Sequence, residues 1–186
     1  MSTRRLGHVR RSACYATAAM SQPRALLVIG VSGVGKTTVG RLLAERLGWA
    51  FLDADDLHPA ANVEKMRSGV PLDDADRWPW LDAVGAWIDA RLAEGRSSVI
   101  ACSALKRAYR DRLREGRPGV RVVFLSGAEA LVAKRLSDRK GHYWPASLLP
   151  TQFAALEPPA PDEHPITVDV GPSPDVLVET ILREFA

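Results

Sequence analysis

The feature that most constrains this chain is a glycine-rich segment between a short apolar run and a helical pattern. The run covers residues 25–30, and an apolar run that ends in glycine is typical of a buried parallel strand. Residues 30–37 fit G-x-x-x-x-G-K-[ST], and residues 35–47 follow at helical spacing. Because glycines let several backbone N–H groups face one anion, and a helix N-terminus adds a positive dipole end, we expect nucleotide phosphates to bind here. The expected contacts are Gly30, Val31, Ser32, Gly33, Val34, Gly35, Lys36, Thr37 and Thr38.

Two residues of this segment predict how the nucleotide is handled. Lys36 is expected to reach the β- and γ-phosphates of ATP, and the hydroxyl of Thr37 to hold Mg²⁺. The alternative is a glycine-rich turn without a ligand. Eight matched positions in the order strand, loop and helix disfavour that alternative, so ATP and Mg²⁺ are the predicted cofactors.

Short apolar runs alternate with helical patterns along the rest of the chain. This alternation predicts βαβ units and a parallel sheet, and therefore an α/β fold. A length of 186 residues suits one domain, which we place at residues 25–186. Strands are expected at residues 51–53, 98–102, 120–125 and 166–170, and helices at 59–68, 78–94, 104–115, 128–138, 150–156 and 174–185.

The positive charge of the chain is concentrated ahead of this domain. Four arginines precede Met20, and leaving them out turns the formal net charge of +3 into −1. A nearly neutral domain does not indicate a nucleic-acid partner. We interpret residues 1–24 as a disordered N-terminal extension, with a transit peptide or a short basic arm as alternatives. No apolar run reaches the roughly 20 residues of a membrane helix, so we expect a cytoplasmic protein without a membrane partner.

Carboxylates follow the second expected strand. Alternation along an extended segment would put Asp53 and Asp55 on the same side, facing the phosphate segment. Phosphoryl transfer needs one group that holds Mg²⁺ or its water and one that takes the proton of the attacking hydroxyl, and we assign these roles to Asp53 and Asp55. The alternative is an acidic turn that caps the next helix, which suits Asp56. A GTPase switch protein is disfavoured because the chain has no Asn-Lys-x-Asp.

Several blocks, in order along the chain, carry a resemblance to a known family. The more specific are Asp-x-Asp-x-Leu-His-Pro at residues 53–59 and Cys-Ser-Ala-Leu-Lys at residues 102–106. With them the chain, from about residue 25 to its C-terminus, resembles the gluconate kinases (gluconokinases), P-loop kinases of sugar acids. It departs from the family at Ala54, where Gly is expected, and at Thr151, where Ser is frequent. The further blocks are residues 30–38, 62–66, 69–77, 79–81, 107–111, 141–143 and 151–157.

The resemblance implies an activity and an architecture. The activity is ATP-dependent phosphorylation of D-gluconate at its terminal hydroxyl, with Mg²⁺, to give 6-phospho-D-gluconate and ADP. The fold is that of the nucleoside monophosphate kinases: three layers around a five-stranded parallel sheet, with a lid that we place at about residues 139–158. A homodimer is usual in the family. Shikimate kinase or another small-hydroxyl kinase of this fold is the enzymatic alternative, and a nucleotide-binding regulatory protein is the non-enzymatic one.

Gluconate is a polyol with one carboxylate, so its site needs a cation and several hydrogen-bonding groups. The candidates for substrate binding are Asp55, His58, Lys65, Arg67, Lys106 and Arg110. Lys106 and Arg110 are spaced i, i+4, so that both could face one ligand. The alternatives are a solvated basic face for residues 106–114 and a helix cap for His58.

Basic residues also precede the expected lid. Arg135 and Arg139 are spaced i, i+4, and the resemblance implies that the lid arginines close on the phosphates during transfer. Cations that stabilise a helix C-terminus are the alternative. With Lys36 and Asp55, these arginines complete the predicted catalytic set.

Overall fold

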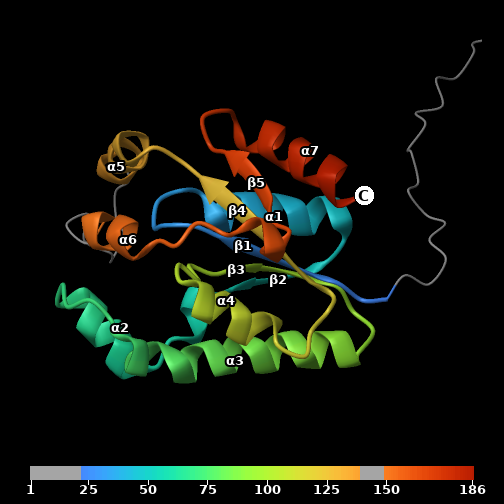
Figure 1. The fold of residues 1–186 in the computed structure, drawn as a ribbon, viewed down its shortest axis with the longest axis horizontal. Helices are drawn as coiled ribbons and strands as arrows, with labels where there is room; N and C mark the ends of the chain where they lie inside the picture. The colour runs from blue at the N-terminus through green and yellow to red at the C-terminus, as the bar shows by residue number, and fades with distance from the viewer. Residues whose placement is uncertain (1–21, 139–148) are drawn as a thin grey trace, which may run out of the picture.

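The computed structural model describes residues 22–138 and 149–186, which form a parallel sheet with helices on both faces (Figure 1). The strands are β1 (Ala25–Ile29), β2 (Ala50–Asp53), β3 (Ser98–Ala101), β4 (Val120–Ser126) and β5 (Ile166–Asp169). The helices are α1 (Lys36–Leu47), α2 (Ala60–Arg67), α3 (Asp74–Ala93), α4 (Arg107–Arg114), α5 (Glu129–Ser137), α6 (Leu149–Ala155) and α7 (Pro174–Phe185), with 3₁₀ turns η1 (Ala54–Leu57) and η3 (Pro161–Glu163).

The five strands are all parallel and lie in the order β2-β3-β1-β4-β5. The predicted α/β fold with a five-stranded parallel sheet is confirmed. The chain leaves β1 in the middle of the sheet, between β3 and β4, so the phosphate segment emerges where the direction of winding switches. Ligands of open parallel sheets bind outside the carboxyl ends of the strands at such a point.

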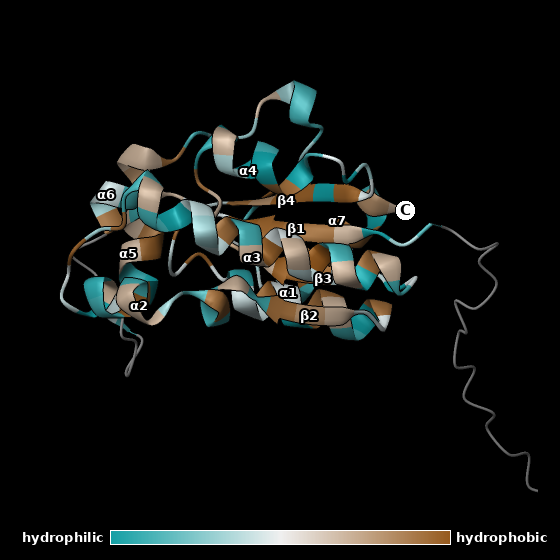
Figure 2. Ribbon diagram, turned by 90° about the horizontal axis from the view of Figure 1, so that it is seen from below, coloured by the Kyte–Doolittle hydropathy of each residue, from teal (hydrophilic) through white to brown (hydrophobic). Residues whose placement is uncertain are grey.

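Two apolar cores separate the sheet from its helical layers. All five residues of β1 are fully buried, and they alternate between the two faces because successive strand side chains point in opposite directions. Leu26 and Val28 pack on the side of α1 and α7, whereas Leu27 and Ile29 pack on the side of α3 and α4. Figure 2 shows the strands as the hydrophobic interior of this three-layer arrangement.

Two helix starts differ from the prediction by more than one residue, and both differences move a residue of the site. Helix α3 begins at residue 74, not 78, because the carboxylate of Asp73 accepts a hydrogen bond from the backbone N–H of Asp76 in a capping box. Helix α4 begins at residue 107, not 104, since Ala104 has a φ of 35°, which a right-handed helix does not allow. Lys106 therefore lies in the loop between β3 and α4.

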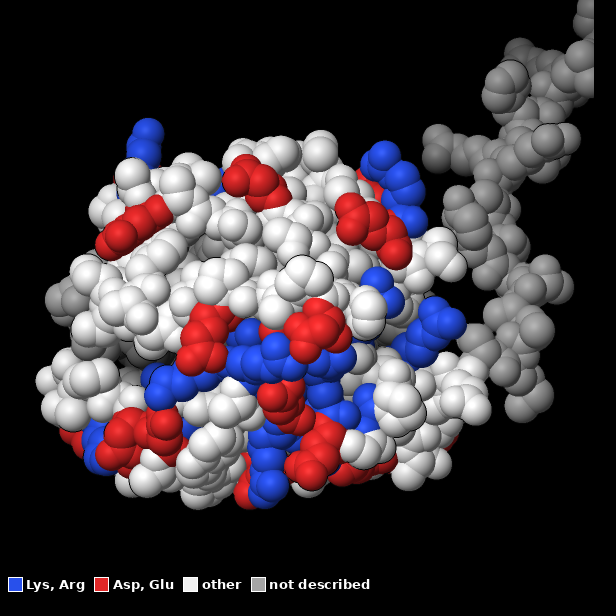
Figure 3. Space-filling view, in the orientation of Figure 1, with Lys and Arg blue, Asp and Glu red and all other residues white. Residues whose placement is uncertain are grey.

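The basic residues of α4 are paired with acidic residues of neighbouring segments. Arg107 forms an ion pair with Asp162 at 2.6 Å, and Arg112 with Asp82 at 2.8 Å. Figure 3 shows basic and acidic side chains interleaved over α3 and α4. On this face the basic side chains therefore alternate with acidic ones and form no continuous positive stripe.

Parts of two predictions lie outside the described residues. These are residues 1–21 of the expected extension and residues 139–148 of the expected lid, the latter with Arg139. Within the described ranges, no helix combines the length and the apolar character needed to cross a membrane.

Candidate active site

The phosphate segment folds as a loop that only glycine accommodates at its first position. Gly30 has a φ of 142°, and a Cβ there would lie 2.8 Å from the carbonyl oxygen of Leu125 on β4. Gly35, at the N-cap of α1, has a φ of 110°. The Nζ of Lys36 donates to the carbonyl of Val31 at 3.0 Å, so the lysine side chain folds back over the loop. The loop thus presents a cation and the N-terminus of a twelve-residue helix at one place.

A hydroxyl and a carboxylate meet beside this loop. Oγ1 of Thr37 donates to Oδ2 of Asp53 at 2.8 Å, which joins the start of α1 to the end of β2. Both are hard oxygen ligands of the kind that Mg²⁺ prefers. The described residues contain no cluster of three or more His, Cys, Asp or Glu able to hold a metal. Mg²⁺ in phosphoryl-transfer sites needs only one or two side chains beside phosphates and water, so the pair fits this ion.

The backbone turns at Asp53, and this corrects the argument from strand alternation. Residues 54–57 form η1 rather than an extended segment, and the carboxylate of Asp53 caps this turn by accepting from the N–H of Asp55 at 3.3 Å. Burial raises the pKa of Cys102, the negative charge of Asp55 raises it further and the charge of Lys36 lowers it, so both charges act on the end of β3. Burial is the largest cause of the shift to about 12, which leaves Cys102 a neutral buried thiol.

His58 is enclosed between the carboxylate turn and α3. Its ring stacks on Trp80 with centroids 4.2 Å apart, and only 4% of its side chain is exposed. Its Nε2 lies 3.9 Å from Oδ1 of Asp55. Burial, helped by the positive charge of Arg77, lowers the pKa of His58 to about 4, so the ring is neutral at physiological pH. A neutral ring in this place can accept or donate a hydrogen bond without adding charge.

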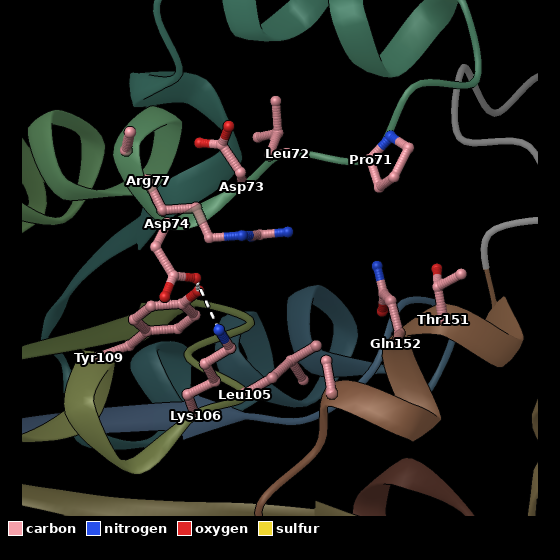
Figure 4. Close-up of a pocket in the computed structure, with 12 residues that line it drawn as sticks. Pro71, Leu72, Asp73, Asp74, Arg77, Leu105, Lys106, Tyr109, Thr151 and Gln152 are labelled. Carbon is pink, nitrogen blue, oxygen red and sulfur yellow. Dashed lines mark hydrogen bonds and ion pairs between the residues drawn. The ribbon is translucent and has the colours of Figure 1, made fainter.

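A pocket of about 590 Å³ opens near the phosphate loop and is built from three separate segments (Figure 4). Residues 71–77 contribute one wall, Leu105, Lys106 and Tyr109 a second, and Thr151, Gln152 and Ala155 of α6 a third. The pocket therefore brings together residues from α3, α4 and α6 that are far apart in the sequence.

Asp74 organises one side of the pocket. Its carboxylate accepts hydrogen bonds from Nζ of Lys106 at 2.6 Å and from the hydroxyl of Tyr109 at 2.5 Å. The hydrogen bond from Lys106 is the main cause that lowers the pKa of Asp74, and the same bond raises the pKa of Lys106. Lys106 is therefore charged, but a neighbouring carboxylate already compensates it.

Arg77 supplies a second cation to the pocket. Figure 4 shows its side chain reaching into the space between Asp74 and Gln152. It forms no ion pair with any residue of the described ranges, in contrast to Lys106. Its guanidinium is thus the cation of the pocket that is not compensated by a carboxylate within 4 Å.

Gln152 connects the pocket to the phosphate loop. Its Oε1 accepts from the backbone N–H of Ser32 at 2.6 Å, and its Nε2 donates to the hydroxyl of Ser32 at 3.0 Å. The side chain is 5% exposed. Helix α6 is therefore fastened to the loop expected to bind phosphate, and the pocket it lines adjoins that loop.

Comparison with known proteins agrees with this geometry. Residues 26–159 match a protein family described as an AAA domain. The chain is 49% identical over 164 residues to the gluconokinase of Gluconobacter oxydans, with 88% of this chain and 92% of the relative covered. It also superposes on the crystal structure of a gluconokinase from Sinorhizobium meliloti with a TM-score of 0.78 and 46% identity, covering 88% of this chain and 91% of the other.

The chain belongs to the gluconokinase family. The predicted family and the prediction of an enzyme are confirmed. Shikimate kinase of Aquifex aeolicus aligns at 17% identity with a TM-score of 0.55 and coverage of 87% and 95%. That likeness shows the P-loop kinase fold alone, so shikimate kinase is a distant fold relative of this gluconokinase-family chain.

The predicted substrate cations have different positions in this gluconokinase-family structure. Lys106 lines the pocket, as expected of a substrate ligand. Lys65 lies outside the lining and pairs with Asp76 at 2.6 Å, and Arg67 is exposed at the end of α2. His58 is also not part of the lining.

Arg110 requires a correction. Its side chain is fully buried and its guanidinium pairs with Glu163, so it does not face the pocket with Lys106. The i, i+4 argument fails because Lys106 precedes α4 and because the inner face of that helix packs on the segment around residue 163. The predicted direct contact of Arg110 with the substrate is wrong.

Arg135 lies on α5, where its Nη2 donates to the carbonyl of Val170 at 2.7 Å. It thereby ties α5 to the loop after β5. Its predicted pairing with Arg139 on the phosphates stays a prediction, since Arg139 lies outside the described ranges.

Among the polar pocket residues that sequence reasoning missed are Arg77, Asp74, Tyr109 and Gln152. All four fall in blocks that carry the family resemblance, at residues 69–77, 102–111 and 151–157. The blocks were a usable signal, but a linear pattern does not tell which of their side chains point into a common space.

Proposed function

We propose that this chain catalyses the ATP-dependent phosphorylation of D-gluconate at its terminal hydroxyl, giving 6-phospho-D-gluconate and ADP. One observation carries the proposal: a pocket lined by Arg77, which forms no ion pair within the described residues, adjoins the phosphate loop through Gln152 and Ser32. An acceptor with an anionic end and a hydroxyl end fits between these two features. The family membership, at 49% identity to a named gluconokinase, supports the same acceptor.

We propose that Arg77 grips the carboxylate of gluconate. A guanidinium binds a carboxylate through two parallel N–H donors, which fixes the orientation of the acceptor as well as its charge. Lys106 is the second cation of the pocket, while Asp74 and Tyr109 offer groups that hydrogen-bond hydroxyls. His58, Lys65 and Arg67 remain weaker candidates because they do not line this pocket.

ATP is proposed to bind with its phosphates in the loop of residues 30–38. Lys36 would leave the carbonyl of Val31 and reach the β- and γ-phosphates. Mg²⁺ would be held by Thr37 and Asp53, and when bound it neutralises charge on the phosphate oxygens. Arg135, with Arg139, is proposed to add positive charge at the transferring group.

The chemical step is an in-line transfer. The terminal oxygen of gluconate forms a bond to the γ-phosphorus, the bond from that phosphorus to the bridging oxygen of ADP breaks, and the hydroxyl proton goes to the carboxylate of Asp55. The charges of Asp55 and Lys36 both act on Cys102 at the end of β3, which supports this role. We also propose that the enzyme is a cytoplasmic homodimer, as the resemblance implies.

A coupled assay tests the function. ADP release is measured with Mg²⁺ and ATP against D-gluconate, other sugar acids, shikimate and nucleoside monophosphates. We expect gluconate to give the highest kcat/KM and 6-phosphogluconate as the product. Absence of ADP release with gluconate, or a preference for shikimate, contradicts the proposal.

A further inference from the structure

Arg110 is a fully buried guanidinium that uses its donors on four partners. Its Nε and Nη2 donate to the two carboxylate oxygens of Glu163 at 2.6 and 2.9 Å. Its Nη1 donates to the carbonyls of Ala104, Leu105 and Glu157 at 3.3, 3.0 and 2.9 Å. Both side chains of the ion pair have no exposed surface. A buried ion pair is weak evidence for stability, because apolar replacements of similar volume are often as stable. Stability alone therefore does not explain why the guanidinium bonds to these four residues.

The three carbonyls belong to two segments that contribute to the acceptor pocket, although only Leu105 among the three residues lines it. Ala104 and Leu105 precede Lys106 in the loop between β3 and α4, whereas Glu157 follows α6. The two segments also bond to each other, since the N–H of Glu157 donates to the carbonyl of Leu105 at 3.0 Å. The guanidinium thus lies at the junction where the Lys106 wall meets the α6 wall.

The loop that Arg110 holds has an unfavourable backbone. Ala104 has a φ of 35°, in the left-handed region that non-glycine residues adopt only when their surroundings impose it. The bonds from Nη1 to the carbonyls of Ala104 and Leu105 impose it here. This backbone directs Lys106 across the pocket to Asp74. Without the guanidinium, the carbonyls of Ala104 and Leu105 would lose these two bonds next to the strained residue.

Glu163 anchors the guanidinium from the other side. Its Oε1 also accepts a hydrogen bond from the N–H of Ala160 at 2.9 Å, at the start of η3. This bond holds the carboxylate in place independently of Arg110. Chain segments on both sides of the ion pair are therefore tied into one unit that includes the end of α6.

We propose that Arg110 is a positioning residue for the acceptor pocket: it fixes the Lys106 loop relative to α6, and so sets the fit of the pocket to the sugar acid. This inference rests on the proposed function, because the pocket is taken to bind gluconate. Arg110 itself touches no substrate. Its loss is expected to weaken gluconate binding and to leave ATP binding on the phosphate loop unchanged.

The test compares Arg110→Lys with Leu113→Ala, both in folded protein as judged by circular dichroism. Leu113 is equally buried on α4 but bonds to neither pocket wall through its side chain, so it controls for loss of stability. A lysine keeps the charge but not the planar fork of donors. We expect Arg110→Lys to raise the KM for gluconate at least tenfold with the KM for ATP changed less than twofold, and Leu113→Ala to change neither.

A double variant separates positioning from stability. Replacing both charges, as Arg110→Met with Glu163→Leu, removes the buried ions together and is expected to recover thermal stability relative to Arg110→Met alone. The KM for gluconate should stay raised because the three carbonyls still lack their donor. Recovery of the gluconate KM along with stability, or an unchanged gluconate KM in Arg110→Lys, overturns the inference. Failure of the unaltered protein to phosphorylate gluconate contradicts instead the proposed function.

Discussion

The phosphate loop takes its shape from consecutive residues, whereas the acceptor pocket is assembled from three segments of the chain. The loop spans residues 30–37, and its glycines and the start of α1 give it a local geometry. The pocket needs residues 71–77, the loop before α4 and helix α6 to meet. A site that binds its ligand through backbone N–H groups can therefore be recognised from a sequence motif. A site made of converging side chains can be recognised only in the folded structure.

Asp55 is the proposed general base, and its replacement is expected to have the largest effect. Asp55→Asn should bind ATP and gluconate but lose roughly 10²–10⁴-fold in kcat, because an amide does not accept the hydroxyl proton. The check is steady-state kinetics together with ATP binding by calorimetry. A kcat near that of the unaltered protein would contradict the assignment of Asp55 as the general base.

Replacement of Lys36 is expected to affect the phosphate loop and not the acceptor pocket. Lys36→Met should lower kcat by roughly 10²–10³-fold, because one preorganised charge on the transferring phosphoryl group is lost. Gluconate binding, measured directly by calorimetry without ATP, should change less than twofold. A comparable loss of gluconate affinity would mean that the two regions are not separate.

Arg77 tests the pocket side. Arg77→Lys should raise the KM for gluconate by about 10- to 100-fold, the value of a hydrogen-bonded charge, with little change in the KM for ATP. Arg91→Lys is the matched control, because Arg91 lies on the same helix and pairs with Glu94 but lies outside the pocket. If Arg91→Lys weakens gluconate binding as strongly as Arg77→Lys does, the assignment of Arg77 is wrong.

The smallest expected effect concerns pH and the enclosed ring of His58. Its pKa is lowered in the folded protein from 6.5 to about 4, so the unfolded chain binds the extra proton between these values. The free energy of unfolding is therefore complete above pH 6.5 and falls as the pH drops toward 4, by about 2 kcal/mol at pH 5. His58→Phe keeps a ring to stack on Trp80 but does not titrate. Its free energy of unfolding should therefore fall less between pH 7 and 5, by this amount. Denaturant unfolding at both pH values measures it, and equal losses in both proteins would contradict the assignment.

The carboxylates show how far sequence reasoning reached into the site. The second strand ends at Asp53, as predicted, but the chain then turns into η1 instead of staying extended through Asp55. A prediction from strand alternation fails there because Asp53 caps the turn with its own side chain. Arg77 was not predicted as a site residue for a related reason. The capping box at Asp73 makes α3 begin at residue 74, so Arg77 lies in the first turn of the helix, beside the pocket.

Reading the residues in order was enough to predict the phosphate loop, the parallel sheet and the family. The loop depends on residues that are adjacent in the chain, and the sheet on the alternation of strands and helices. The family is recognised from motifs, which are defined by residue type and spacing. Only the tertiary structure decided that Lys106 lines the pocket and that Arg110 lies buried behind it. The residue that draws Arg110 inward is Glu163, 53 positions away, and the ion pair forms only when η3 packs against α4. Charge on a helix is readable from the sequence, whereas the direction each charge faces depends on what the folded chain packs against it.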